Sequence, residues 1–184
     1  MPLTLDSSLE ARRLLIRLVT AADLPGLLVV NGDDEVTRHL PYATWQSLDD
    51  AQAWFARMTA MHAAGTALQF AITEKRSGVT IGSCLLFRFD ETSARAELGY
   101  VLGRAYWGQG YMHEALQRLI ACAFGELALR RLEAEVDPRN GRSARLLARL
   151  GFACEGLLPQ RWLTKGEACD VNVYGLLNRA WQAP

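Results

Sequence analysis

The segment LGYVLGRAYWGQGYMHEAL at residues 98–116 has the clearest chemical potential, because an apolar run leads into glycines 108 and 110 and then into a helical pattern. Glycine lets the backbone approach a bound molecule closely. The first N–H groups of a helix lack partners within it, and the helix dipole adds partial positive charge there. The segment therefore predicts a binding site for phosphate or pyrophosphate. A simple flexible turn is the alternative.

Two common phosphate motifs do not fit this loop, and no metal site is apparent. A P-loop requires Lys followed by Ser or Thr, and the dinucleotide fingerprint requires a third glycine where this chain has His113. The three histidines and four cysteines are scattered, without the spacing of metal ligands. We therefore expect chemistry without a metal ion.

Hydrophobic periodicity predicts the elements that must position this loop. Strands are expected at residues 13–18, 67–75, 79–89, 94–102, 131–137, 152–163 and 171–177. Helices are expected from residues 20–23 onward, at 49–64, at 110–124 and at 143–150, with a turn-rich stretch at 31–41. The order β-α-α-β-β-β-α-β-α-β-β predicts an α+β domain around a mixed sheet. Its parallel pair would be 94–102 and 131–137, because a helix joins them.

Composition limits the class of protein. The 184 residues carry 20 basic and 20 acidic side chains, with 50% hydrophobic residues. Zero formal charge argues against a nucleic-acid or anionic-membrane partner, and the hydrophobic content is typical of a globular protein. We expect one domain over residues 1–184, with a core at about 12–178. The first residues lack a signal-peptide pattern, and no apolar run could span a bilayer, so a cytoplasmic protein is expected.

Several segments together resemble one family. Residues 97–100 (ELGY), 107–111 (WGQGY), 114–115 (EA), the pair Asn140 and Ser143, and 150–152 (LGF) are similar to the GNAT superfamily of acetyl-CoA-dependent N-acetyltransferases. They most resemble its branch of ribosomal-protein alanine and serine N-terminal acetyltransferases. The resemblance extends over nearly the whole chain.

The resemblance implies a mixed, mostly antiparallel sheet with splayed central strands and helices on both faces. It also implies acetyl-CoA as the donor, with the pyrophosphate on the loop that follows Trp107, namely Gly108, Gln109, Gly110, Tyr111 and Met112. The pantetheine arm would lie between the separated strands, against backbone groups of Tyr100, Val101 and Leu102. A freed N–H near Tyr100 or Val101 could polarise the thioester carbonyl.

The resemblance assigns further roles after the strand at 131–137. Asn140 matches a position whose side chain holds the pantetheine, and Ser143 matches a serine near the sulfur, where its hydroxyl could donate to the departing thiolate. Each residue could instead cap the helix that begins there. Arg145, with Arg142 and Arg149, could meet the 3′-phosphate or form a solvated basic face.

Glu97 lies on a strand facing the expected splay and is the candidate base, direct or through water. Its alternative role is a rim carboxylate paired with Arg88 or Arg95. We expect an N-acetyltransferase in which an amine attacks acetyl-CoA directly in a ternary complex. The favoured acceptor is a protein N-terminal amine, and a small-molecule amine is the alternative. A non-catalytic CoA-binding module is also considered, and the protein would be a monomer or homodimer.

Overall fold

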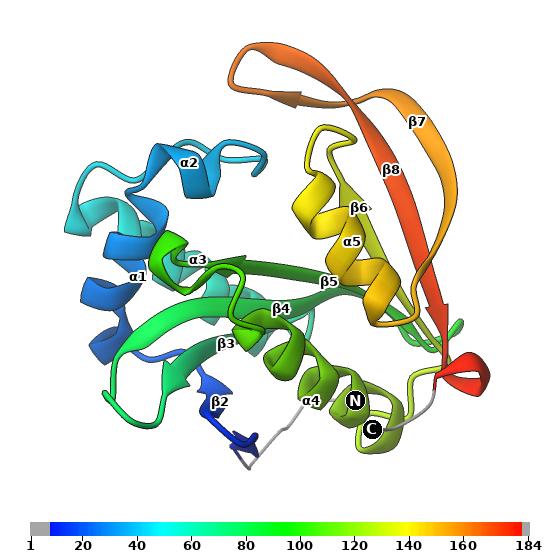
Figure 1. The fold of residues 1–184 in the computed structure, drawn as a ribbon, viewed down its shortest axis with the longest axis horizontal. Coiled ribbons are helices and arrows are strands. Elements are labelled where there is room, and N and C mark those ends of the chain that lie inside the picture. The colour runs from blue at the N-terminus through cyan, green and yellow to red at the C-terminus, as the bar shows by residue number, and fades with distance from the viewer. Residues whose placement is uncertain (1–7, 182–184) are drawn as a thin grey trace.

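An open sheet organises the molecule, with helices against both of its faces (Figure 1). The computed structural model describes residues 8–181. Within that range the strands follow the order β1-β2-β3-β4-β5-β6-β8-β7. Their bounds are Leu9–Glu10 (β1), Leu14–Leu18 (β2), Ala67–Glu74 (β3), Thr80–Asp90 (β4), Arg95–Leu102 (β5), Arg131–Val136 (β6), Ala153–Thr164 (β7) and Glu167–Leu177 (β8).

Five α-helices lie in the described range, at Leu24–Asn31 (α1), Asp34–Thr37 (α2), Leu48–Ala63 (α3), Tyr111–Gly125 (α4) and Gly141–Arg149 (α5). Short 3-10 turns occur at Ala21–Asp23, Arg104–Tyr106 and Asn178–Ala180. The expected element order is confirmed, with two additions: strand β1 and helix α2. Helix α2 interrupts the stretch predicted as a turn, because Asp33 caps a helix by accepting a hydrogen bond from the Glu35 amide.

The sheet is mostly antiparallel, with one parallel pair at its centre. Strands β5 and β6 pair in parallel through Arg95–Arg131, Ala96–Leu132 and Glu97–Glu133. The recorded pairing within these two strands ends there, although β5 continues to Leu102 and remains paired with β4. The predicted splay of the central strands is therefore confirmed, and it begins immediately after Glu97.

The register with β4 determines which backbone groups of β5 face the gap. Gly103 donates its N–H to Ile81 across the β4–β5 pair. Because backbone direction alternates along an antiparallel strand, Val101 also faces β4, whereas Tyr100 and Leu102 face β6. The Leu102 carbonyl accepts a hydrogen bond from the Trp107 indole N–H at 2.8 Å, which agrees with a carbonyl that points away from β4.

Side chains of β5 alternate between two helical layers. Ala96 and Leu98 belong to the main core, together with the buried stripe of α4. Val101 instead packs with Val30 of α1 and Val36 of α2. Helices α4 and α5 therefore share one side of the splay, and α1 and α2 lie on the other (Figure 1). In the described part of the chain, no helix is both long and apolar enough to cross a membrane.

Candidate active site

A cleft of about 1050 Å³ opens between the end of β5, the start of α4, helix α5 and the segment that contains α2. Most of the predicted site residues line it: Tyr100, Val101, Leu102, Trp107, Gly108, Gly110, Tyr111, Met112, Asn140, Ser143 and Arg145. Over residues 8–181 the lining leaves out two predicted residues, Glu97 and Gln109. The splay thus gathers segments that lie about 40 residues apart in sequence.

The loop before α4 requires glycine for conformational reasons. Gly108 has φ +74° and Gly110 has φ +79°, the left-handed region that other residues rarely adopt. A Cβ atom at Gly108 would meet no atom within 4 Å, so backbone conformation rather than crowding explains this glycine. Gly110 is the N-cap of α4, and Glu114 donates its N–H to the Gly110 carbonyl. The first N–H groups of a 15-residue helix are consequently presented at the cleft.

Arg13, the residue before β2, holds this loop in place. Its guanidinium donates to the Gln109 carbonyl at 3.0 Å and to the Glu114 carboxylate at 2.7 Å. Its backbone N–H also donates to Glu114, and the guanidinium lies 4.2 Å from the centre of the Tyr111 ring. Arg13 thus fixes the loop and compensates the charge of Glu114 in the first turn of α4. Sequence reasoning missed this residue.

Tyr111 and Gln109 complete the support of the loop. The Tyr111 hydroxyl donates to Glu74 of β3 at 2.6 Å, and this hydrogen bond lowers the pKa of Glu74. The Gln109 side chain turns back and donates to the Ala105 carbonyl at 2.8 Å. The proposed role of Gln109 in holding the cofactor therefore rests on its backbone.

Tyr100 and Ser143 meet across the cleft. The phenolic oxygen of Tyr100, from β5, lies 2.5 Å from the Ser143 hydroxyl oxygen, from α5. Burial raises the pKa of Tyr100 to about 12, although the Ser143 hydrogen bond opposes the rise. The Asn140 side-chain oxygen accepts from the Ser143 N–H at 3.1 Å, so Asn140 caps α5 and the helix begins two residues earlier than predicted. The Ser143 hydroxyl is thereby directed to Tyr100, while the Asn140 amide N–H groups stay open for a ligand.

Basic side chains of α5 border the same cleft. The Arg142 guanidinium lies 4.5 Å from the centre of the Trp107 ring, so a cation–π contact joins α5 to the glycine loop. Arg145 and Arg149 also line the cleft, as do Arg104 and Arg139. Arg104 pairs with Asp33, and Arg139 pairs with Asp137 and Glu167. The arginines of α5 are therefore the positive charge that suits an anionic ligand in a chain of zero formal charge.

Glu97 lies on the other side of the sheet from Tyr100 and Ser143, next to the start of the splay. Its side chain is 12% exposed and accepts a hydrogen bond from Arg88 at 2.7 Å, the ion pair considered as the alternative to a catalytic role. Burial raises the pKa of Glu97; Arg88 opposes this effect, and the nearby carboxylates of Glu135 and Glu133 add to it. The net rise brings the pKa of Glu97 closer to neutrality, the direction that suits a base.

His39 lines the cleft beside Asp137, which follows β6. The His39 Nδ1 atom lies 3.6 Å from the Asp137 carboxylate, beyond hydrogen-bond distance, while Arg139 holds that carboxylate at 2.7 Å. The sequence offered no sign of this proximity, since His39 precedes Asp137 by almost one hundred residues.

The β7–β8 hairpin spans the rim of the same region. Lys165 at its tip donates to the carbonyl of Thr37, the last residue of α2, at 2.8 Å. Glu167 pairs with Arg139 at 3.1 Å. Figure 1 shows the hairpin arching from the sheet edge toward α2. It thereby connects the two sides of the cleft.

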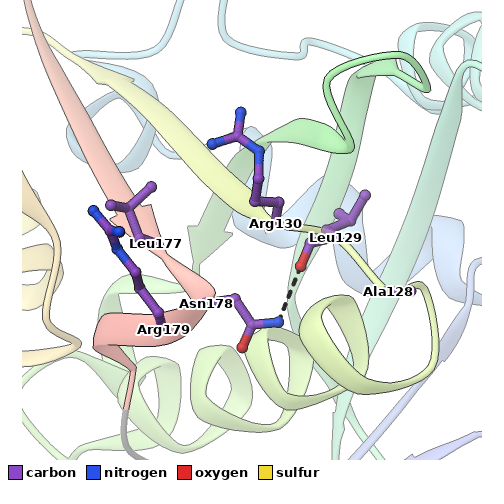
Figure 2. Close-up of a pocket in the computed structure, with 6 residues that line it drawn as sticks. All are labelled: Ala128, Leu129, Arg130, Leu177, Asn178 and Arg179. Carbon is purple, nitrogen blue, oxygen red and sulfur yellow. Dashed lines mark hydrogen bonds between the residues drawn. The ribbon is translucent and has the colours of Figure 1, made fainter.

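Figure 2 shows a second, smaller hollow of about 450 Å³ near the end of β8. Asn178 lies in it and donates to the Leu129 carbonyl at 3.2 Å, which ties the chain after β8 to the segment before β6. Its lining, from Ala128–Arg130 and Leu177–Arg179, includes none of the predicted site residues among those the structure describes.

The model of the acetyltransferase (GNAT) domain matches residues 13–153. The chain belongs to the GNAT family of acetyltransferases. It is 35% identical over 174 residues to an uncharacterised N-acetyltransferase of Bacillus licheniformis, covering 95% of this chain and 98% of the relative. It is also 30% identical over 182 residues to the ribosomal protein uS5-alanine N-acetyltransferase of Escherichia coli, covering 94% and 92% of the two chains.

A solved structure agrees with the GNAT fold. The ribosomal-protein-S5-alanine acetyltransferase of Vibrio fischeri superposes with a TM-score of 0.77 at 25% identity, covering 96% of this chain and all of that one. The protein is therefore an N-acetyltransferase whose donor substrate is acetyl-CoA. The described residues fit this donor through the left-handed glycines, the open start of α4, the unpaired edge of β5 and the arginines. Those residues contain no cluster of metal-binding side chains.

Proposed function

We propose that this GNAT enzyme acetylates a protein N-terminal amine, of the ribosomal-protein type, by direct attack on acetyl-CoA in a ternary complex. The observation that carries the choice of acceptor is the similarity to the E. coli uS5-alanine enzyme, which extends over more than nine-tenths of both chains. That similarity is not confined to the donor loop.

The placement of side chains supports direct transfer. Tyr100 and Ser143 lie on the α4–α5 side of the splay, and Glu97 lies on the opposite face at its start. A donor against the glycine loop and an amine near Glu97 would meet through the gap between β5 and β6. The amine would then lose its proton on one face of the sheet, and the sulfur would gain a proton on the other. No acyl-enzyme would form.

In this proposal, main-chain N–H groups at Gly110–Met112 and the arginines of α5 hold the phosphates. The Tyr100 carbonyl and the Leu102 N–H, which face the gap, pair with the pantetheine amides as a neighbouring strand would. Glu97 takes the proton from the attacking amine, and Ser143 donates a proton to the sulfur. The register favours the Tyr100 N–H over that of Val101 as the donor to the thioester carbonyl, because Val101 faces β4.

The acidity of the acceptor agrees with a modest base. Neutralising a lysine with a pKa of about 10.4 at pH 7 costs about 4.6 kcal/mol, whereas an α-amine near 7.8 costs about 1.1 kcal/mol. Burial raises the pKa of Glu97 and Arg88 opposes the rise, so Glu97 is a modest base. It suits the α-amine better.

The test is a thiol-release assay with acetyl-CoA over peptides that begin with alanine or serine. Matched peptides blocked at the α-amine but carrying lysine, together with polyamines, amino acids and aminoglycosides, form the comparison arm. We expect turnover on free α-amines and loss of turnover on the blocked peptides. Turnover confined to small amines would contradict the peptide acceptor, and tight acetyl-CoA binding without turnover would favour a non-catalytic module.

A further inference from the structure

The hydroxyl pair at the centre of the cleft carries a further inference, which rests on the proposed function. We propose that Tyr100 is a positioning residue that acts through Ser143: its phenol orients the serine hydroxyl and replaces the proton that Ser143 gives to the departing thiolate. In this proposal Ser143 donates to the leaving group, and Tyr100, which also lines the cleft, donates to Ser143.

The Tyr100 and Ser143 hydroxyls are in close contact. The two hydroxyl oxygens are 2.5 Å apart, at the short end of the range for O–H···O hydrogen bonds. The contact joins β5 to α5, two elements that are separate in the sequence and lie on either side of the cleft. Asn140 caps α5 through the Ser143 N–H and so fixes the backbone that carries the hydroxyl.

Either hydroxyl could donate in this contact. In the proposed chain Tyr100 donates and Ser143 accepts, because a phenol is a stronger acid than an alkyl hydroxyl. The Tyr100 phenol is protonated at neutral pH even at its ordinary pKa of about 10. Burial raises that pKa to about 12, which still leaves the phenol more acidic than an alkyl hydroxyl. The Ser143 proton is consequently free to point into the cleft that Ser143 lines.

A serine alone would be a poor acid for this step, since it would become an alkoxide. With Tyr100 as its hydrogen-bond donor, the negative charge ends on the phenol instead. Glu97 accepts the proton of the amine as the new C–N bond forms. Ser143 donates its proton to the sulfur as the C–S bond breaks, and it accepts the phenolic proton of Tyr100. The tyrosinate then regains from solvent the proton that Glu97 releases, so every proton is accounted for.

The first experiment needs no acceptor. The thiol pKa of CoA bound to the wild-type enzyme is measured by thiolate absorbance and compared with Tyr100→Phe, Ser143→Ala and the double variant. Hydrogen-bond donation to the thiolate lowers a thiol pKa, so each single variant should raise it by about 0.5–1, and the double variant should rise no further. An unchanged thiol pKa in Tyr100→Phe would overturn the proposal, whatever happens to turnover.

The second experiment measures turnover on whichever amine the wild type acetylates. We expect kcat to fall by about 10- to 100-fold in Tyr100→Phe, with the KM for acetyl-CoA nearly unchanged, and no further loss when Ser143→Ala is added. If the losses of kcat in the two single variants added up in the double variant, Tyr100 and Ser143 would not act through one hydrogen-bond chain. Tyr42→Phe is the matched control, because its phenol donates to Asn31 at 2.8 Å outside the lining of the cleft, and it should keep wild-type kcat.

These outcomes separate the two proposals. If no amine is acetylated but the thiol pKa rises in Tyr100→Phe, the proposed function fails and the hydrogen-bond chain stands. If N-terminal amines are acetylated but the thiol pKa stays unchanged in Tyr100→Phe, the proposed function stands and the hydrogen-bond chain fails. Thermal melting of each variant checks that removing one oxygen leaves the fold intact.

Discussion

Burial raises the pKa of Glu97, the candidate base, and its ion pair with Arg88 opposes that rise. The pair depends on a distortion of β4: the register with β5 shifts between Phe87 and Asp90, and Arg88 has φ +52°. Such a bulge redirects a side chain, here toward Glu97 at 2.7 Å and Glu135 at 3.6 Å. The same guanidinium thus compensates two carboxylates on neighbouring strands.

Removing Arg88 should change the pH dependence of turnover. Arg88 holds the pKa of Glu97 down against the effect of burial, so Arg88→Met should raise that pKa. Because a base must be deprotonated, the acidic limb of kcat/KM should move to higher pH. In Glu97→Gln the limb of Glu97 should vanish and leave only the titration of the amine. The measurement is a pH–rate profile on an N-terminal peptide.

Arg118→Met provides the matched control for charge, since Arg118 pairs with Glu126 on the exposed side of α4. Its profile should coincide with that of the wild type. A Glu97→Gln enzyme that keeps the full acidic limb would remove Glu97 from the mechanism.

At the scale of elements, β2 and α4 are joined by Arg13, and this contact makes a prediction about cofactor affinity. Arg13→Gln would release the Gln109 carbonyl and remove the cationic partner of Glu114 in the first turn of α4, while the backbone N–H of residue 13 would still donate to Glu114. A carboxylate without a compensating cation there repels the phosphates of acetyl-CoA. We expect the Kd for acetyl-CoA, measured by calorimetry, to rise about tenfold, or about 1.4 kcal/mol.

Two variants test the reason for that loss. Arg12→Gln removes the same charge from the exposed neighbouring residue and should leave the Kd within about twofold. Glu114→Gln combined with Arg13→Gln should recover part of the affinity, because the unpaired charge is gone. If Arg13→Gln kept the wild-type Kd, the contacts of Arg13 with Gln109 and Glu114 would not contribute to acetyl-CoA binding.

The elements also explain which features the sequence could predict. Strands and long helices have periodic burial, so residues 98–116 revealed their strand, loop and helix from local pattern alone. The cleft followed from the family resemblance, because its motifs lie on elements whose order was already clear. Arg13 and His39 escaped notice, since their partners Gln109 and Asp137 are about one hundred residues away. Asn140 was ambiguous for another reason: one side chain can cap a helix with its oxygen and hold a ligand with its amide.

For the molecule as a whole, buried carboxylates that hold segments together determine the response to acid. Asp23 is 2% exposed and joins the start of α1 to β2 and β4. Burial alone would raise its pKa, but hydrogen bonds from Arg17, Thr20 and Thr80 outweigh burial, so the net pKa is lowered. A carboxylate with a lowered folded-state pKa stabilises the protein above its unfolded pKa, and the stabilisation is lost as pH falls through the folded value. The pKa of Asp137, which is also buried, is lowered as well.

Because the folded-state pKa of Asp23 is lowered, its charged form stabilises the fold at neutral pH. Asp23→Asn should lower the free energy of unfolding at pH 7 by about 2–3 kcal/mol, because Arg17 loses its charged partner. For a chain of this size the melting temperature should fall by about 5–10 °C. The stabilisation by the aspartate is lost as the pH falls below the unfolded-state pKa of about 3.9 toward the lowered folded-state pKa of Asp23, so the melting curves of the two proteins should converge as the pH falls. Glu126→Gln, which breaks a surface pair with Arg118, should change the melting temperature by about 2 °C or less. A constant difference between Asp23→Asn and wild type from pH 7 to pH 3 would mean that Asp23 acts through packing rather than charge.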